Sequence, residues 1–197
     1  FGLVTKKMAS LKPSMIEIDI SCPHMDYGKP YHADAELAGK VVSEVKKNCG
    51  KIPVSAKLSP NVHDIKEIAH AAERAGADAI TAINTASGMA VDIDAKKPVL
   101  ANKIGGISGP ALKPIAVRCV YDLYKAVKIP IIGMGGITSW RDAIEIMMAG
   151  ASLVGIGSAV YYEGEEVFNK VAKGMEEFLK KEGYNHVSEL VGLAHED

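Results

Sequence analysis

Cys22 is the residue whose neighbours place it best for chemistry. It follows an apolar run at residues 15–20 and comes just before Pro23, so we expect it at the carboxyl end of a buried strand. The polar segment Met25–Asp34 that follows contains glycine and proline, and it could form a mobile flap over a site. Most free cysteines are only small buried hydrophobic residues, and that alternative stays open. The position of Cys22 favours a reactive thiol at the rim of a sheet.

Two glycine turns much later in the chain are the second chemical feature. Strands predicted at residues 129–133 and 152–156 are followed by Gly135-Gly136 and by Gly157-Ser158. Such turns offer backbone amides with no side chain in the way, and Ser158 adds a hydroxyl donor, so together they could hold a phosphate dianion. A thiol and a phosphate cradle on one rim indicate a phosphorylated cofactor beside a reactive sulfur.

Three polar residues close the strands between these features. Lys57 lies inside an apolar strand at residues 53–58, so its ammonium must either reach water at an edge or face an anion. Asn84 and Thr85 end the strand predicted at residues 79–84, where polar side chains either satisfy the loop or contact a substrate. We expect all three at the same rim as Cys22, with Lys57 suited to an anionic cofactor.

The segment Lys103–Pro110 is rich in glycine and leads into a helix. Glycine permits close approach of the backbone, so Gly106 and its neighbours could form a wall against a flat ligand. A flexible loop is the alternative.

Apolar strands and amphipathic helices alternate along the chain. The strands are short and continuously apolar, which is typical of parallel strands covered on both faces. They are predicted at residues 15–20, 53–58, 79–84, 129–133 and 152–156, and the helices at residues 35–47, 64–74, 114–128, 139–150 and 165–181. Ser139 and Asp142 resemble a capping box at the start of one helix.

This alternation predicts an α/β protein, either an open doubly wound sheet or a (β/α)8 TIM barrel. Phosphate turns after the last two strands are typical of a barrel, which usually takes about 250 residues. With 197 residues and five strand candidates, the chain is predicted to be the last five βα units of a barrel. Residues 1–197 would then form the C-terminal two-thirds of one domain. Its two open sheet edges mean that either the chain is a fragment or another polypeptide completes it.

Composition narrows the class of protein. The chain is 48% hydrophobic, enough for a core, and its net charge of -1 gives no electrostatic case for binding nucleic acid. We find no apolar run long enough for a membrane and no signal-peptide pattern. The three cysteines are scattered, as in a reducing compartment, and the six histidines lack metal-binding spacing. We therefore expect a cytoplasmic protein that binds no nucleic acid, membrane or metal. We also expect an oligomer, although composition does not indicate one.

Several blocks of residues resemble the dihydroorotate dehydrogenases of class 1, the cysteine-base branch. They occur in the family's order over essentially the whole chain: Ser21-Cys22-Pro23, Ala56–Val62, Ile83–Thr85, Lys97–Asn102, Gly105–Pro110, Lys113–Ala116, Gly133–Ile137 and Ala149–Ala151. The stretch Lys113–Arg118 is most similar to the NAD-linked, two-subunit (1B) type. Dihydropyrimidine dehydrogenase, whose flavin domain also contains Ser-Cys-Pro-His, is a close relative.

The resemblance implies a barrel that holds FMN and oxidises dihydroorotate to orotate in pyrimidine (UMP) biosynthesis. Cys22 would take the proton from C5 while hydride leaves C6 for flavin N5. Lys57 would lie near the N1–O2 edge of the flavin, where negative charge develops on reduction. The flavin and its phosphate would be lined by Gly106, Gly135, Gly136, Gly157 and Ser158. Electrons would pass to a partner subunit with FAD and an iron–sulfur cluster, and then to NAD.

The implied substrate site shows two departures from the family. Asn84 and Thr85 match the residues that would bind the pyrimidine and its carboxylate, but Asp19 and His24 stand where asparagine is usual or common. An aspartate accepts hydrogen bonds where an asparagine would donate, which suits an anionic orotate poorly unless Asp19 is protonated. Three alternatives therefore stay open: a dihydropyrimidine-type flavin reductase, a flavin-free sugar-phosphate isomerase or lyase, and a non-catalytic half-barrel that serves in assembly.

Overall fold

A five-stranded parallel sheet is the centre of the computed structural model, which describes residues 1–21 and 33–195. The strands are β1 (Ile16–Asp19), β2 (Val54–Leu58), β3 (Ala79–Ala82), β8 (Ile131–Met134) and β9 (Leu153–Gly155). They lie in the order β1-β2-β3-β8-β9, so each strand pairs with the next main strand along the chain. A doubly wound sheet reverses its order at a switch point, whereas barrel strands never do. The sheet therefore has the order of five consecutive barrel strands, which confirms the predicted fold class.

The helices that follow the strands are also those predicted from sequence periodicity. They are α2 (Ala35–Asn48), α3 (Ile65–Arg74), α4 (Lys113–Ala126), α5 (Trp140–Met148) and α7 (Glu166–Glu182). Their starts follow ordinary capping rules: Asp34 and Asp64 accept backbone N–H bonds, and Ser139 and Asp142 form the expected capping box. Gly76, at φ 95°, ends α3 in the left-handed conformation that favours glycine.

The two faces of the sheet differ in polarity. Ile18, Ala56 and Ile80 are buried on one face, in a core shared with the helices that includes Val42 and Ile68. Alternation along the strands puts Glu17, Ser55, Lys57 and Thr81 on the other face. That polar face points away from the helices and leads to the carboxyl ends of the strands.

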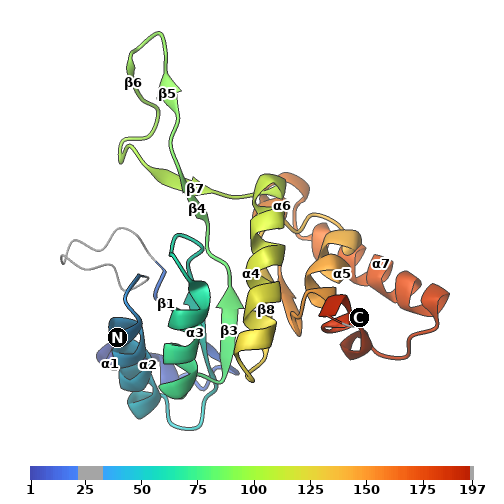
Figure 1. The fold of residues 1–197 in the computed structure, drawn as a ribbon, viewed down its shortest axis with the longest axis horizontal. Coiled ribbons are helices and arrows are strands. Elements are labelled where there is room, and N and C mark those ends of the chain that lie inside the picture. Colours follow the sequence, from blue (N-terminus) through green and yellow to red (C-terminus); the bar gives the residue numbers. More distant parts are fainter. Residues whose placement is uncertain (22–32, 196–197) are drawn as a thin grey trace.

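A projecting arm at residues 86–107 was not predicted from the sequence. It consists of two antiparallel strand pairs: β4 (Ala86–Gly88) with β7 (Gly105–Ile107), and β5 (Val91–Asp92) with β6 (Lys97–Pro98). The segment Lys103–Pro110, predicted as a wall or a flexible loop, contributes β7 to this arm. Figure 1 shows this arm extending well beyond the sheet and its helices. Its short strands contain Gly, Pro and Asp, which is why strand propensity did not reveal them.

Other elements add to the predicted set or correct it. The helices α1 (Gly2–Ala9) and α6 (Ser158–Glu163) and the 3-10 turns η2 (Pro110–Leu112), η3 (Val187–Leu190) and η4 (Leu193–His195) were not expected. The apolar periodicity of residues 165–181 predicts Phe168 on the buried side of the last helix, and this prediction is wrong, because Phe168 is 48% exposed. Cys49 and Cys119 are buried in the core and are free cysteines. Within the described ranges, no helix combines the length and apolar character needed to cross a membrane.

Candidate functional site

A cavity of about 160 Å³ lies at the carboxyl ends of β2, β3, β8 and β9. It brings together most of the residues that sequence reasoning singled out, from four strand ends that are far apart in the chain. Its lining consists of Lys57, Ile83, Asn84, Thr85, Ser108, Gly109, Leu112, Met134, Gly135, Gly136, Ile137, Gly157 and Ser158. The predicted thiol Cys22 and predicted substrate residue His24 lie outside the described residues, so their placement stays a prediction.

The turn after β8 requires glycine for two independent reasons. Gly135 and Gly136 have φ values of 133° and 73°, in the region that L side chains rarely adopt. A Cβ on Gly136 would also lie 2.7 Å from the backbone nitrogen of Lys113 and 2.9 Å from the carbonyl oxygen of Gly109. The turn is therefore packed tightly against the start of α4, and its backbone, not a side chain, borders the cavity.

The turn after β9 differs, because the space around it is open. A Cβ on Gly157 would have no neighbouring atom within 4 Å. Gly157 is the N-cap of α6, and no side chain caps this helix start. The first amides of α6 and the hydroxyl of Ser158 are therefore donors at the cavity that a ligand oxygen could accept from.

Lys57 supplies the positive charge of the cavity. Its side chain is 18% exposed, and its Nζ lies 3.8 Å from Oε1 of Glu17. The other carboxylate oxygen of Glu17 accepts a 2.7 Å hydrogen bond from Thr81, whose hydroxyl also lies 2.8 Å from that of buried Ser55. This network on the polar face of the sheet holds Glu17, and Glu17 in turn holds the lysine near the cavity.

Asp19, Ser21 and Asn84 form a second polar network where β1 and β3 end. One carboxylate oxygen of Asp19 accepts from the Ser21 amide at 2.9 Å and from its hydroxyl at 2.5 Å. Nδ2 of Asn84 donates to the Ser21 hydroxyl at 2.5 Å and lies 3.4 Å from Asp19. The acidic side chain that departs from the family pattern is therefore engaged by donors within the chain.

Gly106 does not line the cavity, although it was predicted to contact the flavin. It lies in β7 across from the cavity residue Thr85, and a Cβ at position 106 would overlap the Thr85 side chain. Gly106 thus lets Thr85 pack closely against the base of the arm. Its predicted direct contact with a cofactor is not tested by this geometry.

Sequence reasoning missed a charged network beneath the glycine turn. Nζ of Lys113 lies 2.8 Å from Oδ1 of Asp142 and 2.7 Å from Oε2 of Glu145. The other oxygen of Asp142 accepts from the amides of Thr138 and Ser139, at 3.1 and 2.8 Å. Local spacing revealed the capping role of Asp142, but Lys113 is too far away in sequence for any periodic pattern to link them.

This network shifts the pKa of both its central groups. Burial raises the pKa of Asp142, but hydrogen bonds from Lys113, Ser139 and Thr138 outweigh it and hold the pKa far below its usual range. Hydrogen bonds to Asp142 and Glu145 raise the pKa of Lys113. Both groups are therefore charged at neutral pH, and they fix the starts of α4 and α5 around the Gly135–Gly136 turn.

The donors at the cavity fit a phosphorylated, anionic cofactor. The cavity is lined by Lys57, which has an ammonium group, by Ser158, which has a hydroxyl, and by the glycines of two turns, whose amides carry no side chain. Amides without competing side chains, together with a cation, are the donors that phosphate binding requires. Within the described ranges, no cluster of three or more His, Cys, Asp or Glu side chains could hold a metal ion.

Comparison with known proteins gives one consistent result. The family model described as dihydroorotate dehydrogenase matches residues 2–179. Three relatives carry the name "Dihydroorotate dehydrogenase B (NAD(+)), catalytic subunit": those of Methanosarcina acetivorans (48% identical), Methanocaldococcus jannaschii (53%) and Pyrococcus furiosus (51%). The alignments cover 100%, 100% and 98% of this chain, but only 63%, 63% and 64% of the relatives. The chain thus spans less than two-thirds of the length of these curated relatives.

Proposed function

The chain belongs to the dihydroorotate dehydrogenase family, and we propose that it carries most of the active site of an FMN-dependent enzyme of the NAD-linked type. In this proposal it oxidises dihydroorotate to orotate in pyrimidine synthesis. The observation that carries the proposal is the rim cavity, because it joins Lys57, Asn84 and Thr85 to two glycine turns. These residues come from the carboxyl ends of four of the five consecutive barrel strands, β2, β3, β8 and β9.

The residues that would hold FMN follow from the donors at the rim. The amides of Gly135, Gly136 and Gly157 and the amide and hydroxyl of Ser158 would bind the phosphate. Lys57 would stand beside the flavin ring, where its charge favours the reduced, more negative form. FMN, when bound, would supply the acceptor for the hydride that leaves C6 of dihydroorotate.

Cys22 is proposed as the base that removes the proton from C5. A thiol acts as a base only when ionised, and an unperturbed cysteine has a pKa of about 8.5. Turnover should therefore rise with pH through the neutral to alkaline range. The support for this role is the resemblance of the Ser-Cys-Pro block, since residue 22 lies outside the described ranges.

Asn84 and Thr85 are proposed to bind the pyrimidine and its carboxylate, with Asp19 and His24 beside them. Asn84 Nδ2 is engaged by Ser21 in this structure, so substrate binding would exchange that hydrogen bond for one to the substrate. The engagement of Asp19 by Ser21 and Asn84 supports a role for this carboxylate in orienting the amide of Asn84.

A second subunit is proposed as the route for electrons. The relatives are named as NAD(+)-type catalytic subunits, a name that implies another subunit in their assemblies. By similarity, an FAD and iron–sulfur subunit would carry electrons from this chain to NAD. We also propose that the enzyme is cytoplasmic and oligomeric.

Anaerobic reduction of the purified full-length protein tests the proposal. The protein should be yellow, should release FMN on denaturation, and should lose its flavin colour when dihydroorotate is added. Dihydrouracil is the matched control, because it lacks only the carboxylate, and it should reduce the flavin far more slowly. A colourless protein would favour the flavin-free barrel, and faster reduction by dihydrouracil would favour the dihydropyrimidine-type reductase.

A further inference from the structure

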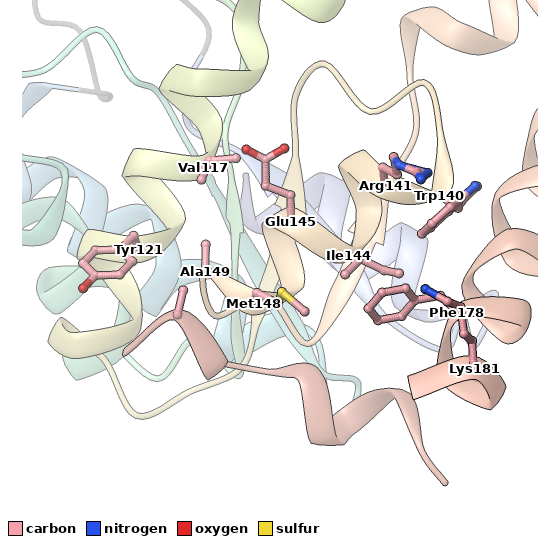
Figure 2. A pocket seen from close by; sticks show the side chains of 11 residues that line it. Val117, Tyr121, Trp140, Arg141, Ile144, Glu145, Met148, Ala149, Phe178 and Lys181 are labelled. Atoms are coloured by element: carbon pink, nitrogen blue, oxygen red, sulfur yellow. The ribbon is translucent and has the colours of Figure 1, made fainter. Parts of the chain in front are cut away.

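A groove of about 490 Å³ lies on the outer helical layer, separate from the rim cavity. It is bounded by α4, α5, the end of α7 and η4 (Figure 2). The lining residues are Val117, Tyr121, Trp140, Arg141, Ile144, Glu145, Met148, Ala149, Phe178, Lys181 and Ala194. Its volume is in the range of about 300–1,000 Å³ that is typical of small-molecule sites.

The walls of the groove come from three helices and a 3-10 turn. Its α4 wall contacts β8, which is paired on both sides, and its α5 wall packs against the edge strand β9 and against α7. The fourth wall is η4, which is fixed on α4 because the His195 ring stacks on Tyr121 with centroids 3.8 Å apart. All four walls are formed by residues that the structure describes.

Aromatic and aliphatic side chains make up most of its surface. The rings of Trp140 and Phe178 lie 5.7 Å apart at one end, and Ile144 and Met148 continue the apolar floor along α5. Residues 140–149 span about 14 Å at 1.5 Å per residue, so the floor is long enough for an extended hydrocarbon chain. An apolar body would replace water over most of this length.

Charge is distributed unevenly along the groove. Arg141 lies over the Trp140 ring at 4.2 Å, and in the described ranges it forms no ion pair. Among the residues that the structure describes, Lys181 pairs with its neighbour Glu182 alone. The acidic residue in the lining, Glu145, lies 2.7 Å from Lys113, an ammonium group that it shares with Asp142. Figure 2 shows Arg141, Trp140 and Lys181 at one end and Tyr121 and Ala149 at the other.

We propose that this groove binds a small amphipathic carboxylate, such as a medium-chain fatty acid. The apolar body would lie along Ile144 and Met148, and the carboxylate would lie between Arg141 and Lys181. Complementary charge favours an anion, because two of the three charged lining residues are cations, and the third, Glu145, is paired with Lys113. An extended peptide fits less well, because the lining consists of helices whose backbone groups are already paired.

Calorimetric titration of the full-length holoprotein with decanoate tests this proposal, with 1-decanol and decyltrimethylammonium as neutral and cationic controls. Fluorescence of Trp140, the single tryptophan of this chain, gives a second readout at the groove itself. Decanoate should bind at least about tenfold more tightly than decanol, and the cation should not bind. Arg141→Gln and Lys181→Gln should each weaken decanoate binding about fivefold, the effect of losing one partly exposed charge pair.

Matched variants separate this site from general charge effects. Arg118 and Lys180 are cations on two of the same helices, but they pair with Asp122 and Glu176 and do not line the groove. Arg118→Gln and Lys180→Gln should therefore leave decanoate binding unchanged. Arg141→Lys keeps the charge and should retain binding if Arg141→Gln loses its fold. Ala194→Phe fills the groove from an exposed position and should abolish binding, while reduction of the flavin by dihydroorotate continues.

Four results would overturn the proposal. Decanol could bind as tightly as decanoate, or the groove and control variants could lose binding equally. Binding could also be undiminished in Ala194→Phe. The fourth result is that decanoate does not bind the folded holoprotein at all, which would leave the groove to a protein partner.

Discussion

The rim cavity and the helix groove are built from different parts of the polypeptide. The rim is formed where strands end, and its donors include backbone amides of glycines. The groove is formed by side chains of three helices and a 3-10 turn, with aromatic rings and two cations. A site formed by backbone amides, such as the rim, keeps its donors as long as the turn is preserved. A site formed by side chains, such as the groove, can be altered one residue at a time. We therefore expect few tolerated changes at the rim and selective, graded effects in the groove.

Replacing Cys22 should give the largest effect on turnover. This effect should involve the rim and not the groove. Cys22→Ser replaces the thiol with a hydroxyl that is far harder to ionise, so turnover of dihydroorotate should fall by about 10²–10⁴-fold. Flavin content and decanoate binding should not change. The measurement is steady-state turnover with the flavin content determined on the same sample.

Cys119→Ser is the matched control, since Cys119 is buried in α4 away from the rim. Burial raises the pKa of the Cys119 thiol, which makes it a poor base at neutral pH. A loss of turnover in Cys119→Ser as large as in Cys22→Ser would refute the special role of the rim thiol.

Asp142 connects the two regions. It pairs with Lys113 at the glycine turn of the rim, and it lies in the first turn of α5, beside Trp140 and Arg141 of the groove. Asp142→Asn breaks the ion pair with Lys113, so the free energy of unfolding at pH 7 should fall by about 2 kcal/mol. The folded-state pKa of Asp142 lies below its unfolded value of about 3.9. Its stabilisation is therefore present above about pH 4 and is lost as the pH falls further.

Urea unfolding at pH 7 and at pH 3 checks this prediction. The difference in the free energy of unfolding between Asp142→Asn and the parent protein should be smaller at pH 3. Asp122→Asn removes an exposed carboxylate that pairs with Arg118 and should change stability little at either pH. If the loss of stability in Asp142→Asn were the same at both pH values, this would contradict the lowered pKa of the Asp142 carboxylate.

Asp19 should give the smallest effect. Asp19→Asn removes a negative charge near the proposed substrate carboxylate, worth about 1 kcal/mol for charges 4 Å apart in water. The KM for dihydroorotate should fall about fivefold, while the KM for uncharged dihydrouracil should stay nearly the same. Equal changes for both substrates would show that Asp19 acts through structure and not through charge.

The sequence predicted those features whose cause is local. Strand ends and helix starts were found because apolar runs and the Ser139–Asp142 capping box each act within a few residues. The rim residues Lys57 and Asn84 were found for the same reason, since parallel strands bring their carboxyl ends together. The arm was missed because its pairs, such as Val91 with Pro98, contain residues of low strand propensity.

The groove and the ion-pair network depend on packing between distant segments. Lys113 meets Asp142 only because α4 and α5 are adjacent, and Phe178 meets Trp140 only because α7 packs on α5. Periodicity marked these residues as helical but gave no information on which helix faces would meet. Phe168 was placed inward for the same reason, although it is exposed.

The most direct test of the phosphate cradle compares FMN with riboflavin, which lacks the phosphate, in fluorescence titrations of the apoprotein. The account predicts that FMN binds at least about a hundredfold more tightly, the effect of one or two charge-assisted hydrogen bonds. Gly157→Val, which adds a side chain in open space at the cavity, should remove most of that preference, whereas Ala194→Phe in the groove should keep it. Equal affinity for the two flavins, or a full preference retained in Gly157→Val, would contradict the account.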